Sequence, residues 1–139
     1  MNLEQLSVLL NDNDEVGKNE PGIGSMQITV ADIKLRKNGI PAIPADFSQL
    51  LKKYNGLSCN GNTIFGLNTG TSFFPDLLDF NIKLLKDEDS SCIILGQDDE
   101  FYLVYDEDAA AYRIIDQSDF EERLRTSSLP EAVTWILKL

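Results

Sequence analysis

Residues 91–116, SCIILGQDDEFYLVYDEDAAAYRIID, decide the fold class of this chain. They contain three short apolar segments, which are Ser91–Gly96, Glu100–Asp106 and Ala110–Asp116. Acidic turns around Asp98-Asp99 and Glu107-Asp108 separate these segments. Strand-length segments joined by short turns are typical of antiparallel neighbours, because parallel neighbours need a long crossover. The stretch therefore predicts a three-stranded β-meander.

Helical patterns flank this meander on both sides. After it, Ser118 with Glu121 and Ser128 with Glu131 form capping-box patterns, which predict helices over 119–126 and 129–138. Before it, apolar residues spaced three and four apart predict further helices, over 3–10, over 30–38 with Thr29 as the cap, and over 45–54. Residues 76–86 fit a helix and a strand about equally, and we take them as a helix.

The remaining segments complete the predicted order of elements. Residues 11–25 are rich in Asn, Gly and Pro and predict a loop, whereas residues 62–67 predict a strand. Runs of like elements indicate an α+β fold, with an antiparallel or mixed sheet flanked by N-terminal and C-terminal helices. A length of 139 residues is that of one domain, so we expect a single domain over 1–139, with residues 1–25 as a helix-and-loop extension.

Charge is the strongest compositional signal. The chain has 23 acidic and 12 basic residues and a net charge of −11. Residues 87–122 hold thirteen acids and one base, so this stretch accounts for the whole excess. Nucleic acids and anionic membranes require a basic surface and are disfavoured as direct partners. Such a stretch is either a solvated surface that aids solubility or a face for a cationic partner.

Several absences narrow the function classes. The chain has no histidine, which excludes Ser-His-Asp and Cys-His catalysis and His-ligated zinc. The cysteines, Cys59 and Cys92, lie far apart and form no metal-binding pair, and the glycines match no phosphate-binding loop. No apolar run could span a membrane, and the first residues do not form a signal peptide. We expect a non-enzymatic cytoplasmic protein without metal or cofactor.

The acidic turns supply the candidate site. Tyr102 alternates with Phe101 and Leu103, so we expect it to be exposed on the less buried face, ringed by acids. The candidate partner-binding residues are Asp98, Asp99, Glu100, Tyr102, Asp106, Glu107 and Asp108. An alternative is a hydrolase that uses a carboxylate pair from these turns with a divalent ion. Asp is also common in turns for conformational reasons alone.

Residues 39–67, GIPAIPADFSQLLKKYNGLSCNGNTIFGL, carry a family resemblance. A helix started by Pro44 ends in Asn55-Gly56, and a strand with Phe65-Gly66 follows. This block resembles the SUKH superfamily, named for the fungal Smi/Knr regulators of glucan synthesis. The order of CIILG, FYLVYD, YRIID and the final helices is also similar to that family, so the resemblance covers residues 27–137. The helix over 30–38 lacks a glutamate that relatives often have.

The resemblance implies an α+β protein-binding domain with no catalytic site. Bacterial SUKH proteins look like immunity proteins, each of which binds and blocks a cognate toxin domain that is often a nuclease. Nucleases are basic because their substrate is anionic, so an acidic inhibitor fits such a partner. The alternative that the family offers is a regulatory scaffold for cell-wall synthesis or signalling. Neither the partner nor the oligomeric state follows from the sequence.

Overall fold

The computed structural model describes residues 1–85 and 91–139. The helices in these ranges are α1 (Leu3–Asp12), α2 (Ser25–Lys37), α3 (Ala45–Lys53), α4 (Leu77–Leu85) and α5 (Leu129–Leu137). The strands there are β1 (Val16–Lys18), β2 (Leu57–Cys59), β3 (Asn62–Ile64), β4 (Cys92–Gln97), β5 (Phe101–Asp106), β6 (Ala111–Asp116) and β7 (Glu122–Thr126). The predicted α+β class is confirmed.

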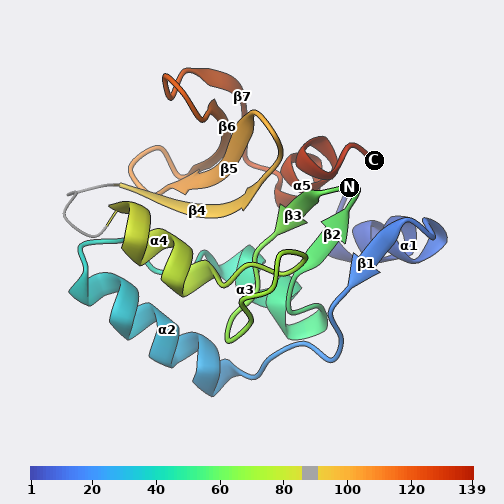
Figure 1. Cartoon of the computed structure of the whole chain (residues 1–139), viewed down its shortest axis with the longest axis horizontal. Coiled ribbons are helices and arrows are strands. Elements are labelled where there is room, and N and C mark those ends of the chain that lie inside the picture. Colours follow the sequence, from blue (N-terminus) through green and yellow to red (C-terminus); the bar gives the residue numbers. More distant parts are fainter. Residues whose placement is uncertain (86–90) are drawn as a thin grey trace.

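The strands of the described residues form one sheet in the order β1 to β7, and each strand pairs antiparallel with the next. The predicted meander corresponds to β4, β5 and β6, which are the longest strands. Along β5 the register runs from Phe101 opposite Asp116 to Asp106 opposite Ala111. Figure 1 shows the meander and β7 at the top of the molecule, above the helical layer formed by α2 and α4.

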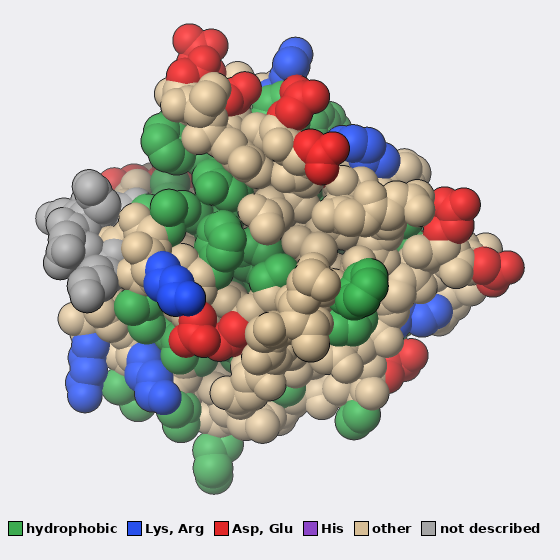
Figure 2. Space-filling view, viewed as in Figure 1, with side chains coloured by type: hydrophobic (Ala, Val, Ile, Leu, Met, Phe, Trp, Pro, Cys, Tyr) green, Lys and Arg blue, Asp and Glu red, His purple; other side chains and the backbone are tan. Residues whose placement is uncertain are grey.

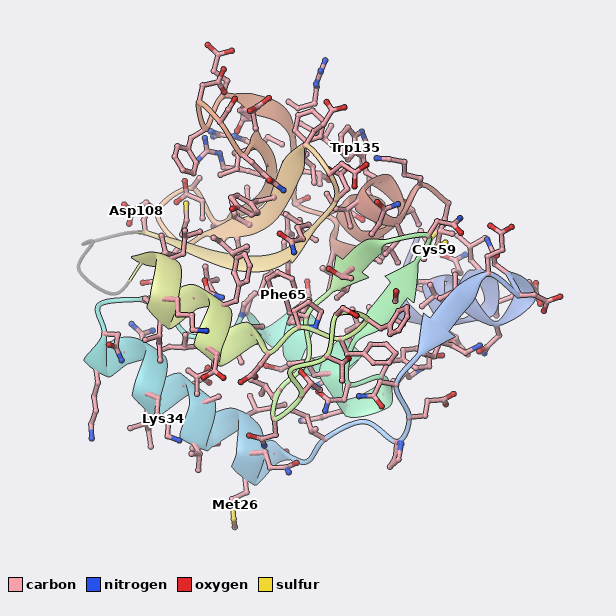
Figure 3. All side chains as sticks on the ribbon, viewed as in Figure 1. Met26, Lys34, Cys59, Phe65, Asp108 and Trp135 are labelled. Carbon is pink, nitrogen blue, oxygen red and sulfur yellow. The ribbon has the colours of Figure 1, made fainter. Side chains whose placement is uncertain are left out.

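Helices cover both faces of the sheet. On α5, Trp135 (Figure 3) meets the ring of Phe101 edge-on, with centroids 5.3 Å apart. On α4, Phe80 meets Tyr102 edge-on at 6.0 Å. Successive residues of a strand point to opposite faces, so α5 and α4 lie on opposite sides of β5. This two-sided cover buries both Leu103 and Val104 completely, so the expectation that one face of β5 is less buried is wrong.

The helix expected over 119–126 is wrong, because β7 occupies most of this range. Asp116 Oδ1 accepts hydrogen bonds from Ser118 N–H at 2.7 Å and from the Ser118 hydroxyl at 2.6 Å, which engages the expected cap in a turn. Leu124 then pairs with Ile114 across the sheet. Pairing with β6 satisfies the backbone N–H and C=O groups of residues 122–126, and this gain outweighs the local capping pattern.

The segment before α3 also differs from the expectation. Residues 11–25 were expected to form a loop, but they contain β1, which pairs with β2. The sequence predicted neither of these two strands. Helix α2 begins at Ser25 rather than at residue 30, because Gly24 N–H donates to Gln27 Oε1 at 3.0 Å and caps the helix there. Thr29 lies inside the helix, where its hydroxyl donates to the carbonyl of Ser25. Strands of three residues are too short to show a period of two.

Other helices agree with their predicted positions. The helix expected over 76–86 is α4, with residue 86 outside the described residues. Helix α5 begins after Ser128, whose side chain accepts a hydrogen bond from Glu131 N–H as expected. Glu131 does not complete the capping box, because its Oε2 accepts from the Thr126 hydroxyl at 2.8 Å. Among the described residues, no helix is long and apolar enough to span a membrane.

Candidate protein-binding surface

The two acidic turns of the predicted site lie at opposite ends of the meander. The turn with Asp98, Asp99 and Glu100 precedes β5, and the turn with Glu107 and Asp108 follows it. A strand of this length spans about 20 Å, at about 3.3 Å per residue. The structure therefore separates the seven predicted residues into two groups and does not bring them together on one continuous face.

Asp98 builds the first turn and is buried. Its Oδ1 accepts hydrogen bonds from the N–H groups of Glu100 at 2.8 Å and Phe101 at 2.7 Å, and its Oδ2 accepts one from Lys138 Nζ at 2.7 Å. Burial alone would raise the pKa of Asp98, but the bonds from Lys138 and the two N–H groups outweigh it and hold the pKa below its usual range. Asp98 is therefore a structural residue of the turn.

Asp106 has the same role in the second turn and is also buried. Its Oδ1 accepts hydrogen bonds from the Ser91 hydroxyl and from the N–H groups of Asp108 and Ala109, at 3.0 to 3.2 Å. Its Oδ2 accepts one from Arg113 Nη1 at 3.1 Å. Burial would raise the pKa of Asp106, but these bonds and the charge of Arg113 lower it. A partner could not reach either Asp98 or Asp106 without opening its turn.

Tyr102 is not the exposed anchor that we expected. Its ring lies on the face of β5 that α4 covers, in edge contact with Phe80, and it is partly buried against the core. The ring therefore fills the space between the sheet and α4.

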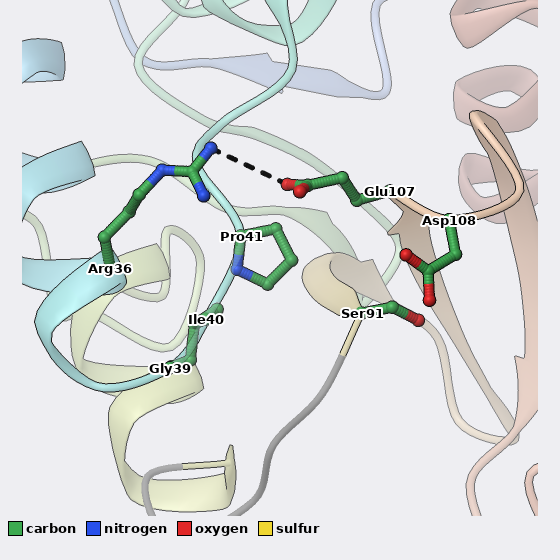
Figure 4. Close-up of a pocket in the computed structure, with 7 residues that line it drawn as sticks. All are labelled: Arg36, Gly39, Ile40, Pro41, Ser91, Glu107 and Asp108. Carbon is green, nitrogen blue, oxygen red and sulfur yellow. Dashed lines mark ion pairs between the residues drawn. The ribbon is translucent and has the colours of Figure 1, made fainter.

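The exposed acids of the second turn border a pocket of about 390 Å³ beside the C-terminal end of α2 (Figure 4). The lining residues are Arg36, Gly39, Ile40, Pro41, Ser91, Glu107 and Asp108. Two of these lining residues, Glu107 and Arg36, form an ion pair at 3.7 Å. This pairing offsets part of the acidic charge at this end of the meander.

The other end of the meander carries exposed acids from two turns. Gln117 links these turns, because its N–H donates to the carbonyl of Glu100 and its Nε2 donates to the carbonyl of Asp98, each at 2.9 Å. We call the exposed acids of the two turns, together with Phe120, the acidic end, and they are Asp99, Glu100, Asp119, Phe120 and Glu121. Within residues 1–85 and 91–139, no ion pair engages these acids. Figure 2 shows acidic side chains at the top of the molecule, with Lys or Arg side chains beside them, and further acidic side chains elsewhere on this face.

Phe120 is the unusual member of the acidic end. Its aromatic side chain is 57% exposed, and in the sequence it lies between the acids Asp119 and Glu121. Its φ of 59° lies in the left-handed region, which is uncommon for a bulky residue. A hydrogen bond from Phe120 N–H to the carbonyl of Asp116, at 2.9 Å, holds this turn. The backbone therefore presents an aromatic ring to solvent among exposed acids.

Sequence reasoning missed Phe120, Asp119 and Glu121 because it assigned them to a helix. Two features of the sequence are typical of a turn and a strand here instead of a helix. Asp116 and Ser118 are typical of an Asx turn, and the polarity of residues 122–126 alternates, although only weakly. The hydrogen bonds of the turn and the pairing of β7 with β6 favour the turn and the strand over the helix that the capping box predicts.

The described residues contain no group of three or more Cys, Asp or Glu side chains placed to hold a metal ion. Cys59 is a buried thiol, and burial followed by the nearby charge of Glu15 raises its pKa. No protein-family model matches the chain, and no curated protein matches it.

Proposed function

We propose that this chain is a non-enzymatic protein-binding domain that neutralises a basic toxin domain by covering its active surface, as the SUKH resemblance implies. The observation that carries the proposal is Phe120, an exposed ring held in left-handed backbone among exposed acids. The contact surface is the acidic end. Asp98 supports it from beneath by holding the turn in shape.

The backbone at Phe120 has an energetic cost. Left-handed backbone costs about 1–2 kcal/mol for a residue with a side chain, and glycine or asparagine would reduce that cost. Burial does not offset this cost, since the ring is mostly exposed. Residues in sparsely populated backbone conformations cluster at functional sites, and aromatic rings are frequent anchors of interfaces.

The surrounding charge selects the partner class. Asp99, Glu100, Asp119 and Glu121 attract a basic surface over about 8–10 Å at physiological ionic strength. Such attraction raises association rates, and like-charged proteins are rejected. A nuclease domain has the required basic surface at the place where its own substrate binds. Covering that surface inhibits the nuclease without any turnover by this chain.

The test is affinity purification of the tagged full chain from its own cells, with elution at increasing salt. Two variants each remove four negative charges. The first is Asp99→Asn, Glu100→Gln, Asp119→Asn and Glu121→Gln in the acidic end. The matched control is Glu4→Gln, Asp12→Asn, Asp14→Asn and Glu20→Gln, at exposed positions near the N-terminus.

We expect wild type and the control to retain a basic domain that about 1 M salt releases, since screening at that concentration leaves a range of only about 3 Å. The acidic-end variant should lose this partner. Equal retention by both variants, or retention at high salt, would contradict the acidic end as the contact surface. If only cell-wall or housekeeping proteins are retained, the regulatory scaffold replaces the immunity function.

A further inference from the structure

Helix α2 is apolar on two opposite faces. Its inward face holds the buried Ile28, Ala31 and Leu35. Its outward face holds Met26, Val30 and Ile33, which are 81%, 46% and 54% exposed. A helix turns 100° per residue, which places the second set opposite the first. We call Met26, Val30 and Ile33 the outer row, and Figure 3 shows Met26 pointing away from the protein.

The outer row has the geometry of a helix-packing seam. Met26, Val30 and Ile33 are spaced by four and three residues, which is the spacing that a second helix contacts. Shallow hollows lie on both sides of the row. One of about 510 Å³ includes Ile33 and Lys37, and one of about 220 Å³ between α2 and α4 includes Val30. The row and its hollows can accept the ridges of a packed helix.

Basic side chains flank the outer row in a protein that is otherwise acidic. Lys34, Arg36 and Lys37 lie in the last turns of α2, where Arg36 is already paired with Glu107, and Lys83 lies in the last turn of α4, a helix that contacts α2. Figure 2 shows Lys and Arg side chains at the lower left, over these two helices, with acidic side chains next to them. The one acid of α2, Asp32, is engaged, because its Oδ1 accepts a hydrogen bond from Ile43 N–H at 2.8 Å. The positive charge of Lys34 and Lys37 beside the outer row favours a partner that carries acidic groups at the contact.

We propose that the outer row docks an amphipathic helix of a second protein, with apolar residues facing the row and acidic residues beside Lys34 and Lys37. Burial of the row supplies apolar contact, and the flanking acids fix the direction of the docked helix. A second copy of this chain fits less well. Its own α2 would bring three more bases and no acid in the first turn, and two chains of net charge −11 repel each other.

This surface is separate from the acidic end. Figure 1 places α2 along the lower edge of the molecule and the β6–β7 hairpin at the top. The two surfaces also differ in sign of charge and in the partner they select. The inference goes beyond the proposed function, since the chain could hold an acidic helix at α2 while its acidic end is occupied.

The test uses a fluorescent designed peptide with leucines at helix-seam spacing and glutamates beside them. A scrambled peptide of the same composition is the control probe. Binding to the full chain is measured by anisotropy. Val30→Glu disrupts the outer row, and Val8→Glu is its matched control, since Val8 is 57% exposed on α1. Lys34→Glu with Lys37→Glu reverses the flanking charge, and Lys52→Glu with Lys53→Glu does so in the last turn of α3.

We expect the glutamate peptide to bind wild type and the scrambled peptide not to bind. Val30→Glu and the Lys34/Lys37 reversal should each weaken binding at least about tenfold, whereas both controls should leave it unchanged. Circular dichroism verifies that each variant is folded. Absence of binding to wild type, or equal loss in the controls, would overturn the proposal. A wild-type dimer in sedimentation that Val30→Glu dissociates would overturn it in favour of a second copy. None of these results depends on the acidic end.

Discussion

The carboxamide of Asn55 is hydrogen-bonded to both backbone groups of Leu67. Asn55 Nδ2 donates to the carbonyl of Leu67 at 2.8 Å, and Leu67 N–H donates to Asn55 Oδ1 at 2.7 Å. Asn55 is only 9% exposed, so this pair joins the end of α3 to the segment after β3 inside the protein. The pair therefore ties Asn55-Gly56 to the segment that directly follows Phe65-Gly66.

Asn55→Ala should destabilise the fold strongly. The variant leaves the buried N–H and C=O of Leu67 without their side-chain partner, and each buried unsatisfied group costs about 1–3 kcal/mol. We expect the free energy of unfolding to fall by about 2–4 kcal/mol in urea denaturation. Asn11→Ala, at an exposed position of α1, is the control and should stay within about 0.5 kcal/mol. Similar losses in both variants would show that the pair contributes little.

Gly66→Ala should also destabilise the fold, for a steric reason. A Cβ at Gly66 would contact the backbone carbonyl of Asn55 and would lie 2.7 Å from its Oδ1. Relief of that clash requires both the backbone and the carboxamide of Asn55 to move, which strains the Asn55–Leu67 pair, so we expect a loss of about 2 kcal/mol or more. Gly24→Ala, where a Cβ meets nothing within 4 Å, should lose less than about 1 kcal/mol. Thermal melting of both variants measures the difference.

The fold was predictable where the sequence pattern is long. The strands β4, β5 and β6 each have six residues, and α3 has apolar residues at Phe47, Leu50 and Leu51 that reveal its buried face. The strands β1 and β2 have three residues each and exist only through pairing with each other and with β3. Their formation depends on contacts that are distant in sequence, and no local pattern reports those contacts.

The candidate site was predictable in composition but not in arrangement. The acidic turns were located correctly, yet Asp98 and Asp99 are indistinguishable in sequence and differ in structure. Asp98 turns inward to Lys138, forty residues away, whereas Asp99 stays exposed. Phe120 was missed because the Ser118–Glu121 capping pattern competes with the turn that Asp116 forms. Long-range partners decide both cases.

Asp98→Asn should change the acid sensitivity of the fold. Because the folded-state pKa of Asp98 is lowered, its carboxylate stabilises the protein above its unfolded pKa of about 3.9. That contribution is lost as the pH falls through this value towards the lower folded pKa. We expect Asp98→Asn to cost about 1–2 kcal/mol at pH 7, with the difference from wild type shrinking below about pH 5.

Chemical denaturation at a series of pH values measures this effect. Asp99→Asn, at the exposed neighbouring position, is the control and should stay within about 0.5 kcal/mol of wild type. A difference between wild type and Asp98→Asn that stays constant down to about pH 2 would contradict the role of the charge on Asp98. Altered hydrogen bonding of the substituted amide with the N–H groups of Glu100 and Phe101 would then account for the whole difference.

Phe120→Asn should raise stability and weaken partner binding. Asparagine tolerates left-handed backbone better than phenylalanine, so relief at φ 59° should raise the free energy of unfolding by about 0.5–1 kcal/mol. Removal of an exposed aromatic anchor should weaken binding of the basic partner more than about tenfold. Urea denaturation and a binding titration with the purified partner measure the two effects.

Ala110→Asn separates strain relief from binding. Ala110 is also exposed and left-handed, with φ 50°, but it lies in the turn after β5 at the opposite end of the meander. It should gain similar stability and bind the partner as wild type does. If Phe120→Asn lowers stability instead, the ring contributes to packing, and its exposure no longer supports a contact role. If Ala110→Asn weakens binding equally, the partner covers both ends of β5, and the contact surface is larger than the acidic end.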